Sequence, residues 1–276
     1  MSFCATSRIE RPLSPAATKP LDKLIIHIHG GGFISMSSSS HQNYTRIWAN
    51  ETGVPIFSID YRLSPKHQFP AALNDIWQVY YYLIERGAAE FGFGKIKKLV
   101  LAGDSAGGNL VVALTVLAIK RNYRKPDGII LSYPGLNITK FDFNPSFLLS
   151  LDDPILPYPF LKLCLESYSG CTTFTDAAIT ENPLVSPSKA SDDILKQFPP
   201  TKMLVASNDP LRDDSFRFSL RLLKLGVPCE IKEFKLMPHG FLSLNFPMWG
   251  MPEESQAGIK MGTKWLREML EIEHSQ

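Results

Sequence analysis

The feature that most constrains this chain is the alternation of short, almost purely apolar runs with longer segments of helical periodicity. The apolar runs are rich in Ile, Leu and Val and do not alternate strictly with polar residues, which is typical of strands covered on both faces in a parallel sheet. We therefore expect an α/β fold, with a doubly wound, mostly parallel sheet, helices on both faces and right-handed crossovers. The predicted strands lie at residues 23–29, 55–60, 97–103, 128–133, 202–207 and 229–235, and the predicted helices at residues 70–86, 107–120, 213–225 and 253–273.

One long stretch interrupts this alternation. Residues 136–200 are rich in proline and aromatic side chains and contain no strand pattern. Because so long an insertion in a compact domain usually has a function, we expect it to form a lid or a wall of the substrate pocket. Residues 1–22, rich in Pro, Ser and Ala, predict a loosely ordered arm, and residues 23–276 a single catalytic domain.

Charge and composition exclude several classes of partner. Lys and Arg total 29 against 27 Asp and Glu, and no basic block occurs, so no nucleic-acid partner is expected. The four cysteines lack C-x-x-C spacing, which indicates free thiols in a reducing compartment. Neither a secretory apolar region nor a stretch of roughly 18 apolar residues is present, so we expect a cytoplasmic protein without a transmembrane segment.

The strongest catalytic signal is GDSAG at residues 103–107, between a predicted strand and a predicted helix. A nucleophile elbow requires this context, because the sharp turn raises the serine hydroxyl above the sheet. The two glycines leave room where a Cβ would clash, and the helix N-terminus favours developing negative charge. A phosphate-binding glycine turn is the alternative, but the G-x-G-x-x-G spacing is absent. Ser105 is therefore the predicted nucleophile.

A glycine run, HGGGF at residues 29–33, follows the first predicted strand. The tetrahedral intermediate of acyl transfer needs preorganised N–H donors, and glycines let the backbone approach the substrate closely. We expect the amides of Gly31 and Gly32 to form an oxyanion hole with the amide of Ala106, directly after the serine. A flexible loop is the alternative, and the occurrence of both motifs in the required order argues against it.

Chain order selects the general base among the six histidines. Where a nucleophile elbow carries a triad, the order along the chain is serine, acid, histidine. His239, in LMPHGF directly after the last predicted strand, satisfies this order. The others precede the serine or lie in the C-terminal tail: His27, His29, His41, His67 and His274.

The acid comes from SNDPLRDD, which begins at the end of the fifth predicted strand. Asp209 immediately follows this strand and is the predicted acid. Asp213 and Asp214 are expected to begin a helix, where acidic residues favour the helix dipole. Asp213 is also a candidate for a supporting contact behind the acid.

These residues together predict covalent acyl transfer. His239 would take the proton of Ser105, which attacks an ester carbonyl, and water would then resolve the acyl-enzyme. His27 and His29, two residues apart on one strand face, are alternative metal ligands, but no third ligand is evident and no metal site is predicted.

Several motifs resemble the hormone-sensitive lipase family of α/β-hydrolases. They are HGGGF, DYRLSP at residues 60–65, GDSAGGNL at residues 103–110, DPLRDD and PHGF. The less generic stretches SFLLSLDDPILPYPFLKLCLESYSG and MPHGFLSL resemble the catalytic domain of the animal-type members.

This resemblance implies an α/β-hydrolase fold, hydrolysis of acylglycerols or related lipid esters, and a cytoplasmic enzyme at lipid droplets without a cofactor. Position by position it also assigns the triad to Ser105, Asp209 and His239, and the oxyanion hole to Gly31 and Gly32. Only about twenty residues precede the first predicted strand, whereas this fold usually has earlier strands and N-terminal cap helices. We therefore expect these elements to be truncated and the acyl pocket to be more open.

Three kinds of function fit these observations. The first is hydrolysis of acylglycerols or related lipid esters, and the near-neutral net charge fits such a neutral, apolar substrate. The second is hydrolysis of small esters by a carboxylesterase or deacetylase. The third is a non-catalytic small-molecule receptor on a hydrolase scaffold, such as the plant gibberellin receptors of this family, which lack the catalytic histidine that His239 supplies here.

Overall fold

A single parallel sheet of six strands organises the part of the chain that the structure describes. This computed structural model describes residues 20–86, 91–138, 144–171, 177–246 and 250–272. The strand order is β2-β1-β3-β4-β5-β6, and each neighbouring pair is parallel. All six predicted strands are confirmed: β1 (Leu21–Ile28), β2 (Ile56–Ile59), β3 (Phe93–Asp104), β4 (Gly128–Ser132), β5 (Thr201–Asn208) and β6 (Cys229–Pro238). Of the predicted arm, residues 1–19 lie outside the described residues.

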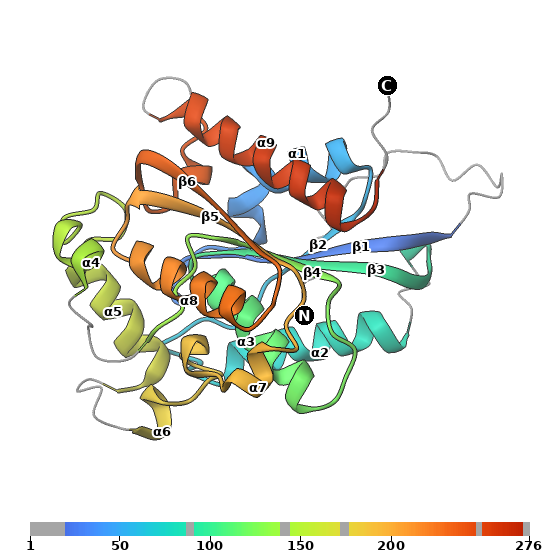
Figure 1. The fold of residues 1–276 in the computed structure, drawn as a ribbon, viewed down its shortest axis with the longest axis horizontal. Coiled ribbons are helices and arrows are strands. Elements are labelled where there is room, and N and C mark those ends of the chain that lie inside the picture. The colour runs from blue at the N-terminus through green and yellow to red at the C-terminus, as the bar shows by residue number, and fades with distance from the viewer. Residues whose placement is uncertain (1–19, 87–90, 139–143, 172–176, 247–249, 273–276) are drawn as a thin grey trace.

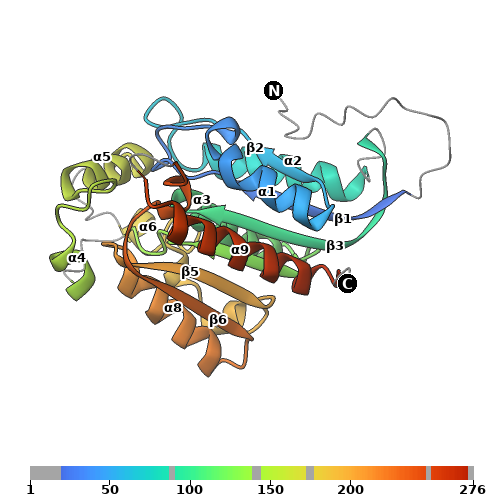
Figure 2. The ribbon, with the colours of Figure 1, turned by 90° about the horizontal axis from the view of Figure 1, so that it is seen from above.

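Helices cover both faces of this sheet (Figure 1), as the doubly wound prediction requires. One face carries α1 (Gln42–Thr52) and α9 (Pro252–Met269), which lie side by side in Figure 2 as well. The opposite face carries α2 (Ala71–Glu85), α3 (Ala106–Lys120) and α8 (Arg212–Lys224). The four predicted helices are thus confirmed, and α1 is a helix that the sequence did not predict.

Burial on both faces explains why the strands read as continuous apolar runs. On β1, the side chains of Leu24, Ile26 and Ile28 belong to the core beneath α2 and α3. Ile25, between them, belongs to the second core, with Trp48 of α1 and Trp265 of α9. Because neither face is exposed to solvent, no polar residue is needed at alternate positions.

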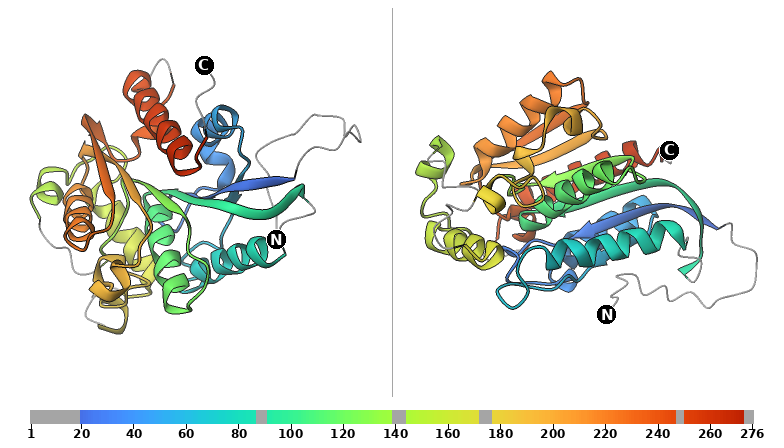
Figure 3. Two further views of the ribbon diagram at one scale, coloured as in Figure 1. Left: turned by 45° about the vertical axis from the view of Figure 1, so that its right-hand side comes forward. Right: turned by 90° about the horizontal axis from the view of Figure 1, so that it is seen from below.

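Short helices fill the insertion at residues 136–200, and its described part contains no strand, as predicted. They are α4 (Pro145–Leu149), α5 (Tyr158–Ser169), α6 (Ala177–Thr180), the 3-10 turn η3 (Pro187–Lys189) and α7 (Asp192–Leu195). The two views of Figure 3 place α4 and α5 beyond one end of the sheet. Residues 144–171, which contain both helices, are called the cap segment below.

Strand register brings the predicted site residues to the carboxyl edge of the sheet. Ile28 of β1 pairs with Gly103 of β3, so the HGGGF loop and the GDSAG turn leave the sheet side by side. Asn208 of β5 pairs with Pro238 of β6, so the residues that follow, Asp209 and His239, also leave it together. The strand order reverses at β1 and β3, and ligands of open α/β sheets bind in the crevice at such a point.

Candidate active site

Ser105 lies on a strained turn between β3 and α3. Its backbone angles are φ 52° and ψ −120°, and a positive φ is uncommon for any residue other than glycine. The Ser105 amide donates to the carbonyl oxygen of Ser132 at 2.9 Å, which ties the turn to β4. A Cβ at Gly107 would lie only 2.6 Å from the His29 carbonyl oxygen, so only glycine fits there. This is the geometry that the sequence predicts for a nucleophile elbow.

The three predicted side chains of the triad form one hydrogen-bonded chain. His239 Nε2 lies 2.8 Å from Ser105 Oγ, and His239 Nδ1 lies 2.9 Å from Asp209 Oδ2. The Leu211 amide donates to the other carboxylate oxygen of Asp209 at 2.8 Å, which fixes the plane of that carboxylate. Both Asp209 and His239 are buried. The structure therefore brings the predicted nucleophile, base and acid within hydrogen-bond reach of one another.

Electrostatics around His239 favour its protonated form. Burial by itself lowers the pKa of His239, but the charge and hydrogen bond of Asp209, with further contributions from Asp153 and Asp104, raise it above its ordinary value. The ring of Tyr133 lies edge-on, with its centroid 5.0 Å from that of the imidazole. An imidazolium formed by proton transfer from Ser105 would therefore be stabilised.

The glycines predicted for the oxyanion hole lie in the loop that leaves the sheet next to the serine turn. Gly31 and Gly32 have φ values of 109° and 61°. In the described part of the chain, the amides of these two glycines donate to no acceptor. Gly32 and Ala106 line the same cavity as Ser105, whereas Gly31 does not line it. A Cβ at Gly32 would overlap the sulfur of Cys164, so the close approach of the cap segment requires glycine here.

The two other candidate acids have different positions. Asp213 and Asp214 lie in the first turn of α8, as predicted. Asp213 Oδ2 accepts a hydrogen bond from the Ser146 amide at 3.1 Å, so its supporting contact is with the cap segment. Asp214 lines the cavity.

A buried polar cluster behind the serine went unpredicted. Asp104 Oδ1 accepts hydrogen bonds from the Gly30 amide at 2.9 Å and from the Tyr44 hydroxyl at 3.0 Å. Its other oxygen lies 3.2 Å from His41 Nε2. Burial by itself raises the pKa of Asp104, but His41 holds it well below its ordinary value, and Asp104 in turn raises the pKa of His41. The position of Asp104 inside GDSAG was the only sequence signal for this cluster.

The alternative of His27 and His29 as metal ligands receives no support from their contacts. His27 bonds Ser58 Oγ and the Tyr44 hydroxyl, each at 2.8 Å, and burial lowers its pKa to about 3. His29 bonds the Gly30 carbonyl oxygen at 2.7 Å and stacks on Tyr61. Among the residues that the structure describes, no group of three or more His, Cys, Asp or Glu could hold a metal ion.

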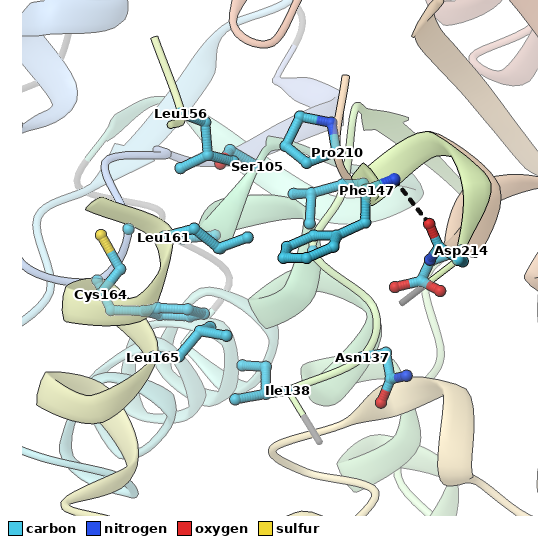
Figure 4. Close-up of a pocket in the computed structure, with 16 residues that line it drawn as sticks. Ser105, Asn137, Ile138, Phe147, Leu156, Leu161, Cys164, Leu165, Pro210 and Asp214 are labelled. Carbon is cyan, nitrogen blue, oxygen red and sulfur yellow. Dashed lines mark hydrogen bonds between the residues drawn. The ribbon is translucent and has the colours of Figure 1, made fainter. Parts of the chain in front are cut away.

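An apolar cavity of about 50 Å³ opens beside Ser105 (Figure 4). Figure 4 shows the ring of Phe147 pointing into it from α4, with Leu161 and Leu165 of α5 beside it. Cys164 also lines it, and burial raises the pKa of this thiol to about 12, so the thiol stays protonated at neutral pH. In the described part of the chain, Cys164 and Cys229 are free thiols.

The class of α/β-hydrolases is defined by a mostly parallel sheet with a serine elbow at its carboxyl edge. An aspartate and a histidine follow later strands of this sheet. Comparison with known proteins agrees, because the alpha/beta hydrolase fold family matches residues 25–243. The chain belongs to this family, and the predicted fold class is confirmed. None of the helices in the described ranges is long and apolar enough to span a membrane.

Relatives of known function are carboxylic ester hydrolases. Hormone-sensitive lipase of Mus musculus is 44% identical over 53% of this chain and 19% of its own length. An esterase of Acinetobacter venetianus is 32% identical over 85% of this chain and 72% of its own. The crystal structure of carboxyl esterase 2 from Tuber melanosporum superposes on this chain with a TM-score of 0.80 and a sequence identity of 27%. The match covers 91% of this chain and 81% of the esterase chain.

These matches confirm the resemblance to the hormone-sensitive lipase family and group the chain with esterases and lipases. The chain spans about one fifth of the length of the mouse hormone-sensitive lipase that it matches.

Proposed function

We propose that this chain hydrolyses carboxylic esters through an acyl-enzyme on Ser105. The observation that carries the proposal is the unbroken chain of hydrogen bonds from Asp209 through His239 to Ser105, at the mouth of an apolar cavity. Nucleophilic catalysis needs a nucleophile and a base within hydrogen-bond reach of each other, and a third group that orients the base. The buried carboxylate of Asp209 fixes the tautomer that leaves Nε2 free to take the serine proton.

In the proposed reaction, the Ser105 oxygen attacks the ester carbonyl while its proton passes to His239 Nε2. The amides of Gly31, Gly32 and Ala106 would hold the resulting oxyanion. His239 then gives its proton to the departing alkoxide, and an alcohol leaves. Water, deprotonated by the same histidine, attacks the acyl-enzyme and releases the carboxylic acid and free Ser105. No cofactor takes part in these steps.

The proposed substrates are acylglycerols or related lipid esters. The sequence identity of 44% with mouse hormone-sensitive lipase supports this substrate class. The lining of the cavity, which is mainly apolar, also supports it, and includes Phe147, Leu156, Leu161 and Leu165. With about 50 Å³, the cavity is several times smaller than the roughly 300–1,000 Å³ of pockets that enclose a drug-sized ligand. This small size favours small esters as the second candidate.

The proposal places the reaction at the surface of a lipid droplet in the cytoplasm. It is supported by large apolar side chains that the cap segment exposes to solvent, among them Leu148, Leu149, Leu151 and Leu163. Single exposed apolar residues are ordinary, but several near the entrance of a site indicate an interaction surface. Flotation of the protein with a phospholipid-coated triacylglycerol emulsion tests this part, and a protein that stays entirely in the aqueous fraction contradicts it.

Hydrolysis is tested with p-nitrophenyl esters of increasing acyl length and with diacylglycerol, comparing the wild type with Ser105→Ala. We expect the wild type to be faster by several orders of magnitude. Equal rates on every substrate would refute the proposal. Saturable binding of an ester, measured by calorimetry without turnover, would instead identify a receptor, although the presence of His239 argues against this alternative.

A further inference from the structure

A carboxylate of the cap segment reaches the backbone of the proposed general base. Asp153 Oδ2 accepts a hydrogen bond from the His239 amide at 2.9 Å, although 86 positions separate the two residues in the sequence. The other oxygen, Oδ1, accepts from the amides of Ile155 and Leu156 at 2.8 and 2.6 Å. The side chain of Asp153 is thus fixed by the cap segment and buried against the loop that carries His239.

The loop that carries His239 makes a tight turn against the cap segment. It follows the end of β6 at Pro238, and Gly240, the residue after His239, has a φ of 73°. A Cβ at Gly240 would meet Ile155 Cγ2 at 3.4 Å, so the cap segment packs directly against this turn. The hydrogen bond from the His239 amide to Asp153 therefore ties His239 to a segment distant in sequence.

The cap segment is also attached to the two other loops of the site. Near the acid, Ser146 Oγ donates to the Pro210 carbonyl oxygen at 3.3 Å and accepts from the Asp213 amide at 3.1 Å. Near the glycine loop, the ring of Tyr168 stacks on Phe33 with centroids 3.8 Å apart. The loops that bear the base, the acid and the glycines are thus each in contact with the same segment.

The geometry assigns Asp153 as a positioning residue of the proposed hydrolysis, acting through His239. This inference rests on the proposed function. The carboxylate fixes the height of the histidine backbone above the sheet and so the approach of Nε2 to Ser105 Oγ. Misplacement of a catalytic group by about 1 Å can cost on the order of a hundredfold in rate.

The negative charge of Asp153 also acts on the pKa of the His239 ring, which a purely structural contact would not do. The titratable groups that face His239 are Asp209 after β5, Asp104 at the end of β3, Tyr133 after β4 and Asp153 in the cap segment. Each of the three carboxylates raises the pKa of His239. Removal of the Asp153 charge must therefore lower this pKa and move the acid limb of the pH–rate profile to lower pH.

Asp153→Asn is the variant that tests this role, and Asp152→Asn is its matched control, because Asp152 is the exposed neighbour with the same charge. We expect kcat of Asp153→Asn to fall at least about tenfold with a much smaller change in KM. The acid limb of kcat/KM should move to lower pH only in Asp153→Asn. Wild-type kcat and an unshifted acid limb in Asp153→Asn would overturn the inference.

A second measurement separates this inference from the proposed function. In a Ser105→Ala background, NMR titration of the His239 ring reports its pKa without any turnover, and Asp153→Asn should lower it where Asp152→Asn does not. An unchanged pKa of the His239 ring would overturn the inference even in an inactive protein. Failure of the proposed function has a different result, namely equal rates of ester hydrolysis by the wild type and Ser105→Ala. If Asp153→Asn does not fold, Asp153→Glu keeps the charge but moves it by one methylene, and a wild-type kcat there would overturn the positioning role.

Discussion

His41 Nε2 lies 3.2 Å from Oδ2 of Asp104, the residue directly before the proposed nucleophile. Both side chains are buried, and each shifts the pKa of the other toward the charged state. The same carboxylate accepts a hydrogen bond from the Gly30 amide, so one buried side chain connects the serine turn with the glycine loop. A network placed between two loops of a site can set their spacing as well as their stability.

Replacement of Asp104 should therefore affect both stability and rate. In Asp104→Asn the buried His41 loses the carboxylate that raises its pKa, and a buried polar group left without its partner costs about 1–3 kcal/mol of unfolding free energy. We also expect a lower kcat, since the Gly30 amide loses the charged acceptor that positions the adjacent Gly31 and Gly32. Urea unfolding and ester hydrolysis measure the two effects.

Asp193→Asn is a suitable control for this variant, because the Asp193 side chain is 94% exposed and lies 3.9 Å from Lys196. A surface pair of this kind contributes little to stability. If Asp104→Asn unfolded at the same urea concentration as Asp193→Asn, the contact between Asp104 and His41 would have no structural role.

Stability should fall in mild acid because of His27. Its pKa is about 3 in the folded chain against an ordinary value of 6.5, so below pH 6.5 the unfolded chain binds a proton that the folded chain does not. The contribution of the neutral His27 to the free energy of unfolding is thus fully present above pH 6.5. It is lost as the pH falls toward 3, at about 1.4 kcal/mol per pH unit. His27→Gln should remove this slope, so its deficit in unfolding free energy relative to the wild type should shrink between pH 7 and pH 5.

The control for His27→Gln is His67→Gln, at a partly exposed histidine. Its unfolding free energy is measured at the same two pH values. A deficit of His27→Gln that is equal at pH 7 and pH 5 would contradict the prediction.

The sequence was sufficient for the sheet and insufficient for α1. Strands buried on both faces leave an unmistakable apolar run, whereas QNYTRIWANET in α1 is mostly polar and buries Tyr44, Thr45 and Trp48. Because α1 has no continuous apolar stripe, its sequence shows no helical periodicity of apolar residues. The short helices of the cap segment were missed for a related reason, because their form depends on packing against loops far away in sequence.

The proposed triad could be predicted because each member directly follows a strand end or lies in a motif. Asp209 and His239 leave the sheet after Asn208 and Pro238, which pair across β5 and β6. By contrast, Asp104 and His41 are 63 positions apart, and no local pattern indicates that they meet. Partnerships of this kind depend on the three-dimensional path of loops, which residue spacing alone does not determine.

The identity of the acid can be tested directly. Asp209→Asn should lower kcat by about 10⁴-fold, because an amide no longer holds the His239 tautomer or stabilises the imidazolium. Its acid limb should also lie at lower pH, since Asp209 raises the pKa of His239. Asp213→Asn, which disturbs the contacts to Ser146 and Arg212, should lose far less activity. Equal losses in the two variants would show that Asp209 is not the acid.

Phe147 should limit the length of the acyl chain. Its buried ring points into the cavity (Figure 4), and Phe147→Ala would extend this space away from Ser105. We expect kcat/KM for p-nitrophenyl esters to shift toward longer acyl chains, together with a loss of about 3–5 kcal/mol of unfolding free energy. Leu149→Ala is the matched control, because Leu149 lies two positions along α4, is 84% exposed and does not line the cavity. If both variants kept the wild-type chain-length profile, the acyl chain would have to occupy another part of the site.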